Sequence, residues 1–194
     1  SRPAQDYPEL SNWAALVKRG KDIPDSPERD EMTSCLRLLT RCASYHSSKV
    51  GAVNDLIMHR FYSTTHVVTK IARSETCPRG DPCYVAAWRL LAKLSRDPAR
   101  IGDAFRDEDV VGMCRTMLKE VDVESKLLPN DTLEAMLDTL EGIGSGLFGD
   151  HLAVQLPMLR IPLNRCSRLR PHFGKKIIDI NFQISRSTKS VLGN

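Results

Sequence analysis

A literal G-x-G-x-x-G runs from Gly144 to Gly149 and is the first pattern in this sequence that could do chemistry. In dinucleotide-binding folds this pattern follows a strand and opens a helix, so that backbone amides meet a pyrophosphate. Here it follows an amphipathic helical stretch from Leu133 to Ile143, and no β-α-β pattern surrounds it. We therefore interpret Gly144 as a helix terminator and predict no cofactor.

The histidines and cysteines do not have the spacing of a metal site. The five histidines, at positions 46, 59, 66, 151 and 172, include no i, i+4 pair and no Cys-x-x-Cys partner. Cys35, Cys42 and Cys114 lie in apolar stretches, where a free thiol behaves as a small hydrophobe, and no activating base can be assigned to any of them. We expect no metal, no enzymatic activity, and a reduced intracellular protein that is cytoplasmic or nuclear.

The loop from Cys77 to Cys83 leaves an alternative open. Its two cysteines could close a small disulfide ring in an oxidising compartment. The loop also contains Arg79-Gly80-Asp81, which resembles the tripeptide that integrins recognise. Asp81 followed by Pro82 is typical of a helix N-cap and its first position, so the structural role is the favoured interpretation.

Positive charge is concentrated at the end of the chain. Residues 160–194 contain eight Lys or Arg against one acid, Asp179, whereas the whole chain carries a net charge of +4. The basic residues are Arg160, Arg165, Arg168, Arg170, Lys175, Lys176, Arg186 and Lys189. Such a segment attracts phosphate backbones, acidic peptides or anionic membrane surfaces. A nucleic-acid-associated helical domain is therefore an alternative function, although only Phe173 and Phe182 are available there for base stacking.

The conformation of this basic segment is ambiguous from its pattern. Alternation of apolar residues indicates a strand at positions 178, 180, 182 and 184. The same stretch also fits one helical face, formed by Phe173, Ile177, Ile180, Ile184 and Val191. Because the preceding chain has helical patterns, we predict a helix packed on the same domain.

A weak internal repeat organises the rest of the sequence. An apolar-x-x-Leu pattern followed by an apolar-Gly pair begins at Leu36, Trp88 and Leu137, so the copies are 52 and then 49 residues apart. Repeats of this length are typical of helical solenoids, in which each unit covers the apolar face of its neighbour. With 41% apolar residues and only short apolar runs, the chain is expected to form a core without a membrane span.

Helix signals recur in phase with this repeat. Further helices are expected over Leu10–Val17, Lys49–Arg60 and Ser63–Arg73. Helix starts are indicated by Asp97-Pro98, by Asp109, and by Asp131 with Glu134 as a capping-box-like pair. These signals predict a helix and Pro-containing linker at 1–30, a repeat domain at 31–170 and the basic helix or tail at 171–194.

The stretch from Tyr84 to Lys119 resembles the junction between two armadillo repeats, with Ala-Ala-Trp, a leucine-rich helix and an Asp-Pro turn. The resemblance implies an all-α, right-handed α-solenoid of about three armadillo-like repeats. It also implies a concave groove formed by Glu31–Ala43, Tyr84–Ser95 and Asp131–Ile143. Such grooves bind extended peptides in this family.

One departure from the family limits this inference. In nuclear-import receptors an Asn follows the groove Trp by four residues, and Trp88 matches that Trp. The corresponding positions here are Thr40, Ala92 and Glu141, so recognition of classical nuclear signals is not expected. Trp88 also suits a core position, because large aromatic side chains dominate cores as well as interfaces.

These patterns together predict a scaffold or adaptor domain that binds another protein. The predicted partner-binding residues are Arg37, Arg41, Tyr84, Trp88, Arg89 and Lys93. Because four of these six are basic, the partner segment is expected to be acidic or extended. Homodimerisation is a further alternative, since a short solenoid with an uncapped end tends to associate.

Overall fold

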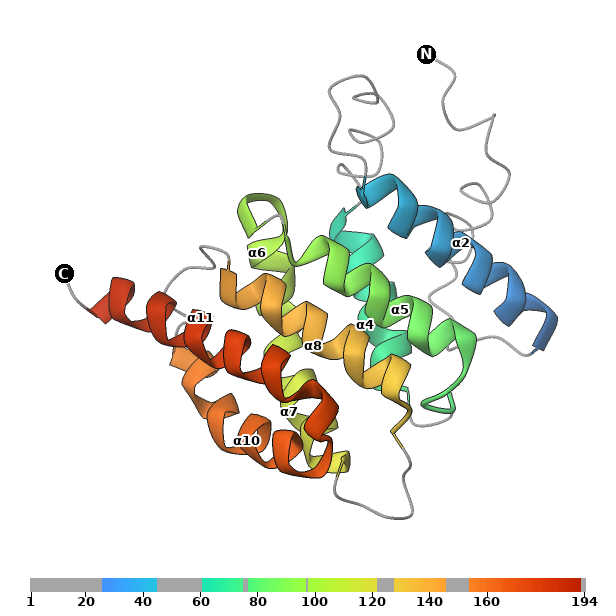
Figure 1. The fold of residues 1–194 in the computed structure, drawn as a ribbon. Helices are drawn as coiled ribbons and strands as arrows, with labels where there is room; N and C mark the ends of the chain where they lie inside the picture. The colour runs from blue at the N-terminus through green and yellow to red at the C-terminus, as the bar shows by residue number, and fades with distance from the viewer. Residues whose placement is uncertain are drawn as a thin grey trace.

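The described part of the chain is helical. The computed structural model describes residues 26–44, 61–74, 77–96, 98–121, 128–145 and 154–192, and these ranges contain helices and turns but no strand (Figure 1). The elements are α2 (Ser26–Ser44), α4 (Phe61–Arg73), α5 (Pro82–Leu94), α6 (Pro98–Asp107), α7 (Val110–Glu120), α8 (Asn130–Ser145), η2 (Leu156–Leu159), α10 (Arg160–Leu169), η3 (Pro171–Phe173) and α11 (Gly174–Leu192). The predicted all-α class is confirmed. None of these helices combines the length and apolar content that crossing a bilayer requires.

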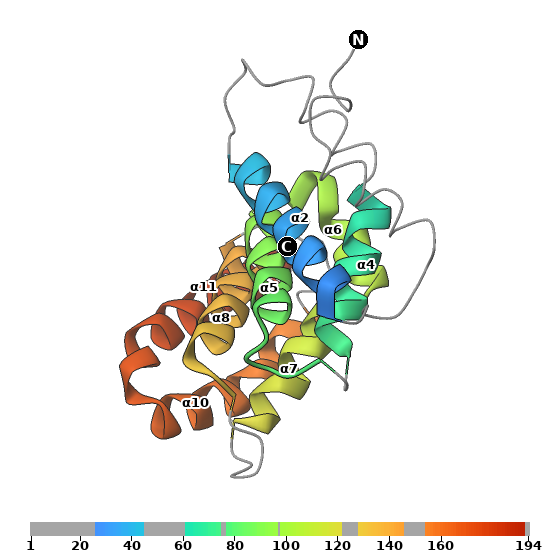
Figure 2. The same ribbon diagram turned by 90° about the vertical axis from the view of Figure 1, so that its right-hand side faces the viewer.

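Four helices lie side by side in chain order. Helix α5 packs between α2 and α8, and α11 packs on the other side of α8 (Figures 1 and 2). Helices α4, α6 and α7 lie behind this row, with α4 against α5, whereas α10 packs beside α11 and against α7 (Figures 1 and 2). The fifty-residue pattern thus marks helices that pack on one another, because α2, α5 and α8 contain most of the three predicted groove segments. The armadillo repeat itself stays a prediction.

Adjacent helices of the row run in the same direction. The Thr132 hydroxyl at the start of α8 donates to the Arg79 carbonyl, 2.6 Å away, just before α5 begins. Near the other ends, a Cβ on Gly142 of α8 would lie 1.9 Å from the Ser95 hydroxyl and 3.1 Å from the Ser95 carbonyl carbon. Glycine at 142 therefore permits the close approach of α8 to the end of α5.

Helix α5 is the centre of the core. Tyr84, Trp88 and Leu91 are fully buried, and they belong to one apolar cluster that extends from α2 to α11. The Asp81 side chain caps the helix by accepting a hydrogen bond from the Cys83 amide at 2.8 Å, and Pro82 occupies the first helical turn. The predicted cap is therefore confirmed. Asp109 likewise caps α7, from a left-handed conformation with φ 48°.

Several helix boundaries differ from those expected. Helix α2 begins at Ser26, five residues before the predicted start, so residues 26–30 are helical and do not form part of a linker. Helix α8 begins at Asn130, which places Asp131 within the first turn. There its negative charge interacts favourably with the positive end of the helix dipole. Gly144 does not terminate α8, because the helix continues to Ser145.

Several predicted features, among them the Asp97 helix cap, lie outside the described residues. The predicted helices over Leu10–Val17 and Lys49–Arg60 lie outside the described residues, as does the Gly146–Gly149 part of the glycine pattern. Helix α4 corresponds to the helix expected from Ser63 but begins at Phe61.

The basic C-terminal segment forms the long helix α11, as predicted. Ile177, Ile180 and Ile184 are buried on the face that packs against α8. The Ser187 hydroxyl donates to the Gly144 carbonyl at 2.8 Å, which fixes the far end of α11 on the far end of α8. The segment therefore forms a helix and not a strand, because the helix buries all three isoleucines on one face.

Candidate functional site

A hollow of about 410 Å³ lies between α2 and α5 and extends to the first turn of α8. Its lining includes two arginines of α2 and one of α5, together with small and polar residues of the three elements. The lining residues are Arg37, Thr40, Arg41, Gly80, Pro82, Val85, Ala86, Arg89 and Asp131. We call this hollow the arginine hollow.

Helical periodicity sets the positions of its three arginines. On α2, Leu36 and Leu39 are buried against α5, which leaves Arg37 and Arg41, one turn apart, exposed along the edge of the helix. On α5, Arg89 is exposed although its neighbours Trp88 and Leu90 are buried. Parallel packing of the two helices then brings the three side chains to one hollow.

The charge of the arginine hollow is not neutralised internally. Among the described residues, no carboxylate forms an ion pair with Arg37, Arg41 or Arg89. Asp131 is the one acid in the lining. Three guanidinium groups around one small hollow offer many hydrogen-bond donors in a geometry that suits carboxylates. The hollow is therefore suited to an anionic ligand.

Two of the predicted groove residues belong to the core instead. Tyr84 and Trp88 are fully buried, so neither side chain can contact a partner on this surface. The Tyr84 hydroxyl donates to the Ala72 carbonyl at 2.9 Å, and its burial raises the pKa of the phenol to about 12. The structure places both side chains in the core, the alternative that the sequence left open for Trp88, because an amphipathic aromatic side chain fits a core and a surface equally well.

Lys93, the remaining predicted residue, lies one turn beyond Arg89 and is partly exposed, but it does not line the arginine hollow. The sequence interpretation placed Thr40 in the predicted groove but missed Val85 and Ala86, which also form part of the lining. Helical spacing indicates these positions. Val85 precedes Arg89 by four residues and Thr40 follows Arg37 by three, so each pair lies on one side of its helix.

The Arg79-Gly80-Asp81 tripeptide has an internal structural role. The Arg79 guanidinium donates to both oxygens of Glu120 on α7, at 2.9 and 3.0 Å, and to the Tyr84 hydroxyl at 2.8 Å. Asp81 caps α5 and pairs with Arg29 of α2 at 3.2 Å. The loop thus ties α2, α5 and α7 together.

The thiols of this loop are free and buried. Burial raises the pKa of Cys83 to about 12 and raises that of Cys77 above its usual value, so both stay protonated at neutral pH. Cys35 and Cys114 are buried and form no disulfide, as expected of small hydrophobes, and Cys166 is buried as well. A protonated, buried thiol is not a nucleophile.

His66 belongs to a polar cluster between α4 and the turn before α7. Its Nδ1 lies 2.7 Å from Glu108 Oε1, and Thr69 and Arg73 donate to Glu108 Oε2 at 2.8 and 3.1 Å. Burial raises the pKa of Glu108, but the hydrogen bonds from His66 and Thr69 outweigh it, so the pKa is lowered. Within the described residues, no group of three or more His, Cys, Asp or Glu side chains is placed to hold a metal ion.

The predicted basic patch lies on α10 and α11, at the end of the helix row opposite α2 (Figures 1 and 2). Arg160, Arg165, Arg168, Lys175, Arg186 and Lys189 are exposed. Arg170 and Lys176 are partly buried and are held by internal bonds. Arg170 donates to Asn130 Oδ1 at 2.7 Å, and Lys176 pairs with Asp138.

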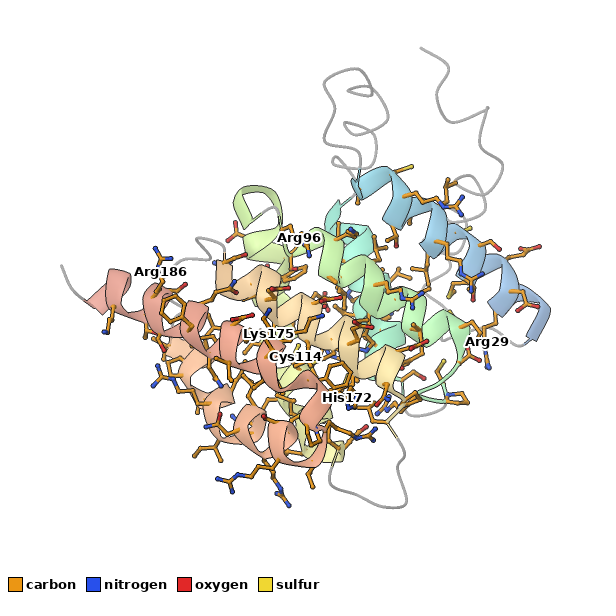
Figure 3. The ribbon with its side chains drawn as sticks, viewed as in Figure 1. Arg29, Arg96, Cys114, His172, Lys175 and Arg186 are labelled. Atoms are coloured by element: carbon orange, nitrogen blue, oxygen red, sulfur yellow. The ribbon has the colours of Figure 1, made fainter. Side chains whose placement is uncertain are left out.

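A second hollow, of about 510 Å³, lies between α8 and the beginning of α11, on the side where Figure 3 shows His172 and Lys175. Its charges are mixed, since Glu134, Glu141 and Asp179 line it together with Lys175 and Lys176. Acids and bases compensate one another in this hollow, which makes it a weaker candidate for binding ions than the arginine hollow.

Comparisons of the chain with protein-family models, with curated proteins and with solved structures find no match.

Proposed function

We propose that this chain is an armadillo-like protein-interaction domain that binds an extended acidic segment of a partner protein in the arginine hollow. It acts in this proposal as an intracellular scaffold or adaptor. The observation that carries the proposal is the convergence of Arg37, Arg41 and Arg89, none of them ion-paired within the described structure, from two neighbouring helices onto one hollow.

The arrangement of the row supports an elongated ligand. Helices α2, α5 and α8 lie side by side, so a peptide that crosses them meets successive helices at regular intervals. Arginine forks bind carboxylates in a bidentate manner, so glutamate or aspartate side chains are the natural partners of Arg37, Arg41 and Arg89. The volume of about 410 Å³ lies within the range of small-ligand sites and accommodates only a short part of such a peptide.

The apolar wall of the hollow supplies the remaining contact surface. Val85 and Ala86 of α5 line the hollow together with the three arginines. A small apolar side chain of the partner would cover this wall. We therefore expect an acidic segment that also contains a small apolar residue.

A direct test measures binding of a fluorescent, glutamate-rich peptide to the full chain by anisotropy. Arg37→Glu with Arg89→Glu is expected to weaken binding by roughly tenfold or more, since each reversal replaces an attraction by a repulsion. The matched control is Arg115→Glu with Lys119→Glu, which makes the same charge change at two exposed residues of α7 outside the hollow. Equal affinity of the double variant and the wild type would exclude the arginine hollow as the binding site.

A further inference from the structure

The outer side of α10 and α11 exposes large apolar side chains. The exposed fractions are 83% for Ile161, 67% for Ile178 and 63% for Phe182. Exposed cations flank them on both helices. We define the α10–α11 face by Ile161, Arg168, Lys175, Ile178, Phe182, Arg186 and Lys189.

The packing of the two helices explains why this face points outward. Helix α10 buries Leu163 and Cys166, so Ile161 and Arg168 lie on its opposite side. Helix α11 buries Ile180 and Ile184 against α8, so Ile178 and Phe182 lie on its opposite side. Two side-chain contacts hold α10 beside α11. Asn181 Nδ2 donates to Asn164 Oδ1 at 3.1 Å, and Arg160 donates to the Ser185 hydroxyl at 2.6 Å.

The cations of this face lack acidic partners. Within the described residues no carboxylate pairs with Arg168, Lys175, Arg186 or Lys189, although Lys176, which points toward α8, pairs with Asp138. The Arg186 guanidinium lies 6.0 Å from the centre of the Phe182 ring, so charge and apolar surface are adjacent. Figure 3 shows Arg186 and further nitrogen-tipped side chains projecting away from the two helices.

We propose that the α10–α11 face is a docking surface for an anionic lipid bilayer. Ile161, Ile178 and Phe182 enter the interfacial region, where their apolar atoms leave water. The surrounding Lys and Arg side chains contact lipid phosphates and the negative surface potential of the membrane. Both kinds of side chain are needed. The cations attract the protein to the membrane surface, and the apolar side chains hold it there.

Three other ligands would fit the α10–α11 face less well than a lipid bilayer. A nucleic acid would use the cations but leave Ile161 and Ile178 without partners, since stacking requires aromatic rings. A second copy in a two-fold arrangement would bring the same cations face to face. A helix of an acidic protein docks in a groove, and neither of the two hollows described above is lined by Ile161, Ile178 or Phe182.

The test is sedimentation of the full chain with vesicles of phosphatidylcholine, with and without roughly one third phosphatidylserine, at about 0.1 M salt. The wild type is expected to sediment only with the anionic vesicles. Ile178→Ser with Phe182→Ser removes apolar contact but no charge, and Arg186→Glu with Lys189→Glu reverses two charges. Each pair is expected to weaken sedimentation by roughly tenfold or more.

The matched control is Lys70→Glu with Arg96→Glu, which makes the same charge change at exposed residues outside both the arginine hollow and the α10–α11 face and is expected to leave sedimentation unchanged. Circular dichroism of each variant confirms that the helices are intact. No sedimentation of the wild type with anionic vesicles would overturn the proposal. So would full binding by the Ile178→Ser, Phe182→Ser variant, because purely electrostatic capture indicates a nucleic acid or an acidic protein. Loss of a dimer in the same variant, without any vesicle binding, would assign the face to self-association.

Discussion

Arg79 and Arg89 lie ten residues apart in the sequence and have opposite surroundings. The Arg79 side chain is 21% exposed and forms hydrogen bonds with Glu120, Tyr84 and the Ser74 carbonyl. Arg89 is exposed, lines the arginine hollow and has no ion pair among the described residues. The guanidinium of Arg79 serves the fold, whereas that of Arg89 is available to a ligand.

The two cationic surfaces show a second difference. The arginine hollow is concave, and its apolar residues, Val85 and Ala86, are small. The α10–α11 face exposes Ile161, Ile178 and Phe182, which are large. The two surfaces have similar charge but differ in shape and in the size of their apolar side chains. We therefore assign a peptide to the arginine hollow and a lipid bilayer to the α10–α11 face.

The largest effect is expected where an internal cation is removed. Arg79→Ala leaves Glu120, whose side chain is 12% exposed, without its partner, and should lower the free energy of unfolding by about 3 kcal/mol. Urea denaturation measures this loss. The matched control, Arg89→Ala, should change the free energy of unfolding by no more than about 0.5 kcal/mol. Similar values for the two variants would remove the distinction between structural and available arginines.

A smaller, pH-dependent effect is expected at Glu108, which is bound by His66, Thr69 and Arg73. Because its pKa is lowered in the folded protein, its contribution is complete above the unfolded value of about 4.3 and is lost as the pH falls through the lowered folded value. Glu108→Gln should therefore cost about 1 kcal/mol at neutral pH, and the difference from the wild type should close below about pH 4.

Thermal unfolding of both proteins between neutral and acidic pH measures this difference. Glu31→Gln, an exposed acid of α2, is the matched control and should show no such pH dependence. A constant gap across the pH range would mean that the charge of Glu108 does not stabilise the fold. Glu108 would then resemble Arg89, whose charge does not stabilise the fold, and not Arg79.

The features that periodicity determines were predictable from the sequence. The row of α2, α5 and α8 follows from apolar residues at helical spacing, and the Asp81 cap follows from the Asp-Pro pair. Arg37, Arg41 and Arg89 were also predicted, because charged residues on an otherwise apolar helix must point away from the core.

The remaining features depend on contacts distant in sequence. Arg79 has its structural role only because Glu120, 41 residues later, reaches it from α7. The burial of Tyr84 and Trp88 is equally a tertiary outcome, since an aromatic residue on α5 suits either side of the helix. The exposure of Ile178 and Phe182 follows from α11 packing on α8 through a different set of residues, which the pattern alone left undecided between helix and strand.

The most direct test of two separate binding surfaces is simultaneous binding. The full chain is sedimented on vesicles that contain phosphatidylserine, in the presence of the fluorescent glutamate-rich peptide. We predict that the peptide sediments with the vesicles only when the wild-type chain is present, and that Arg37→Glu with Arg89→Glu releases the peptide but not the protein. Displacement of the wild-type chain from the vesicles by the peptide would show that one surface binds both ligands and would contradict the account.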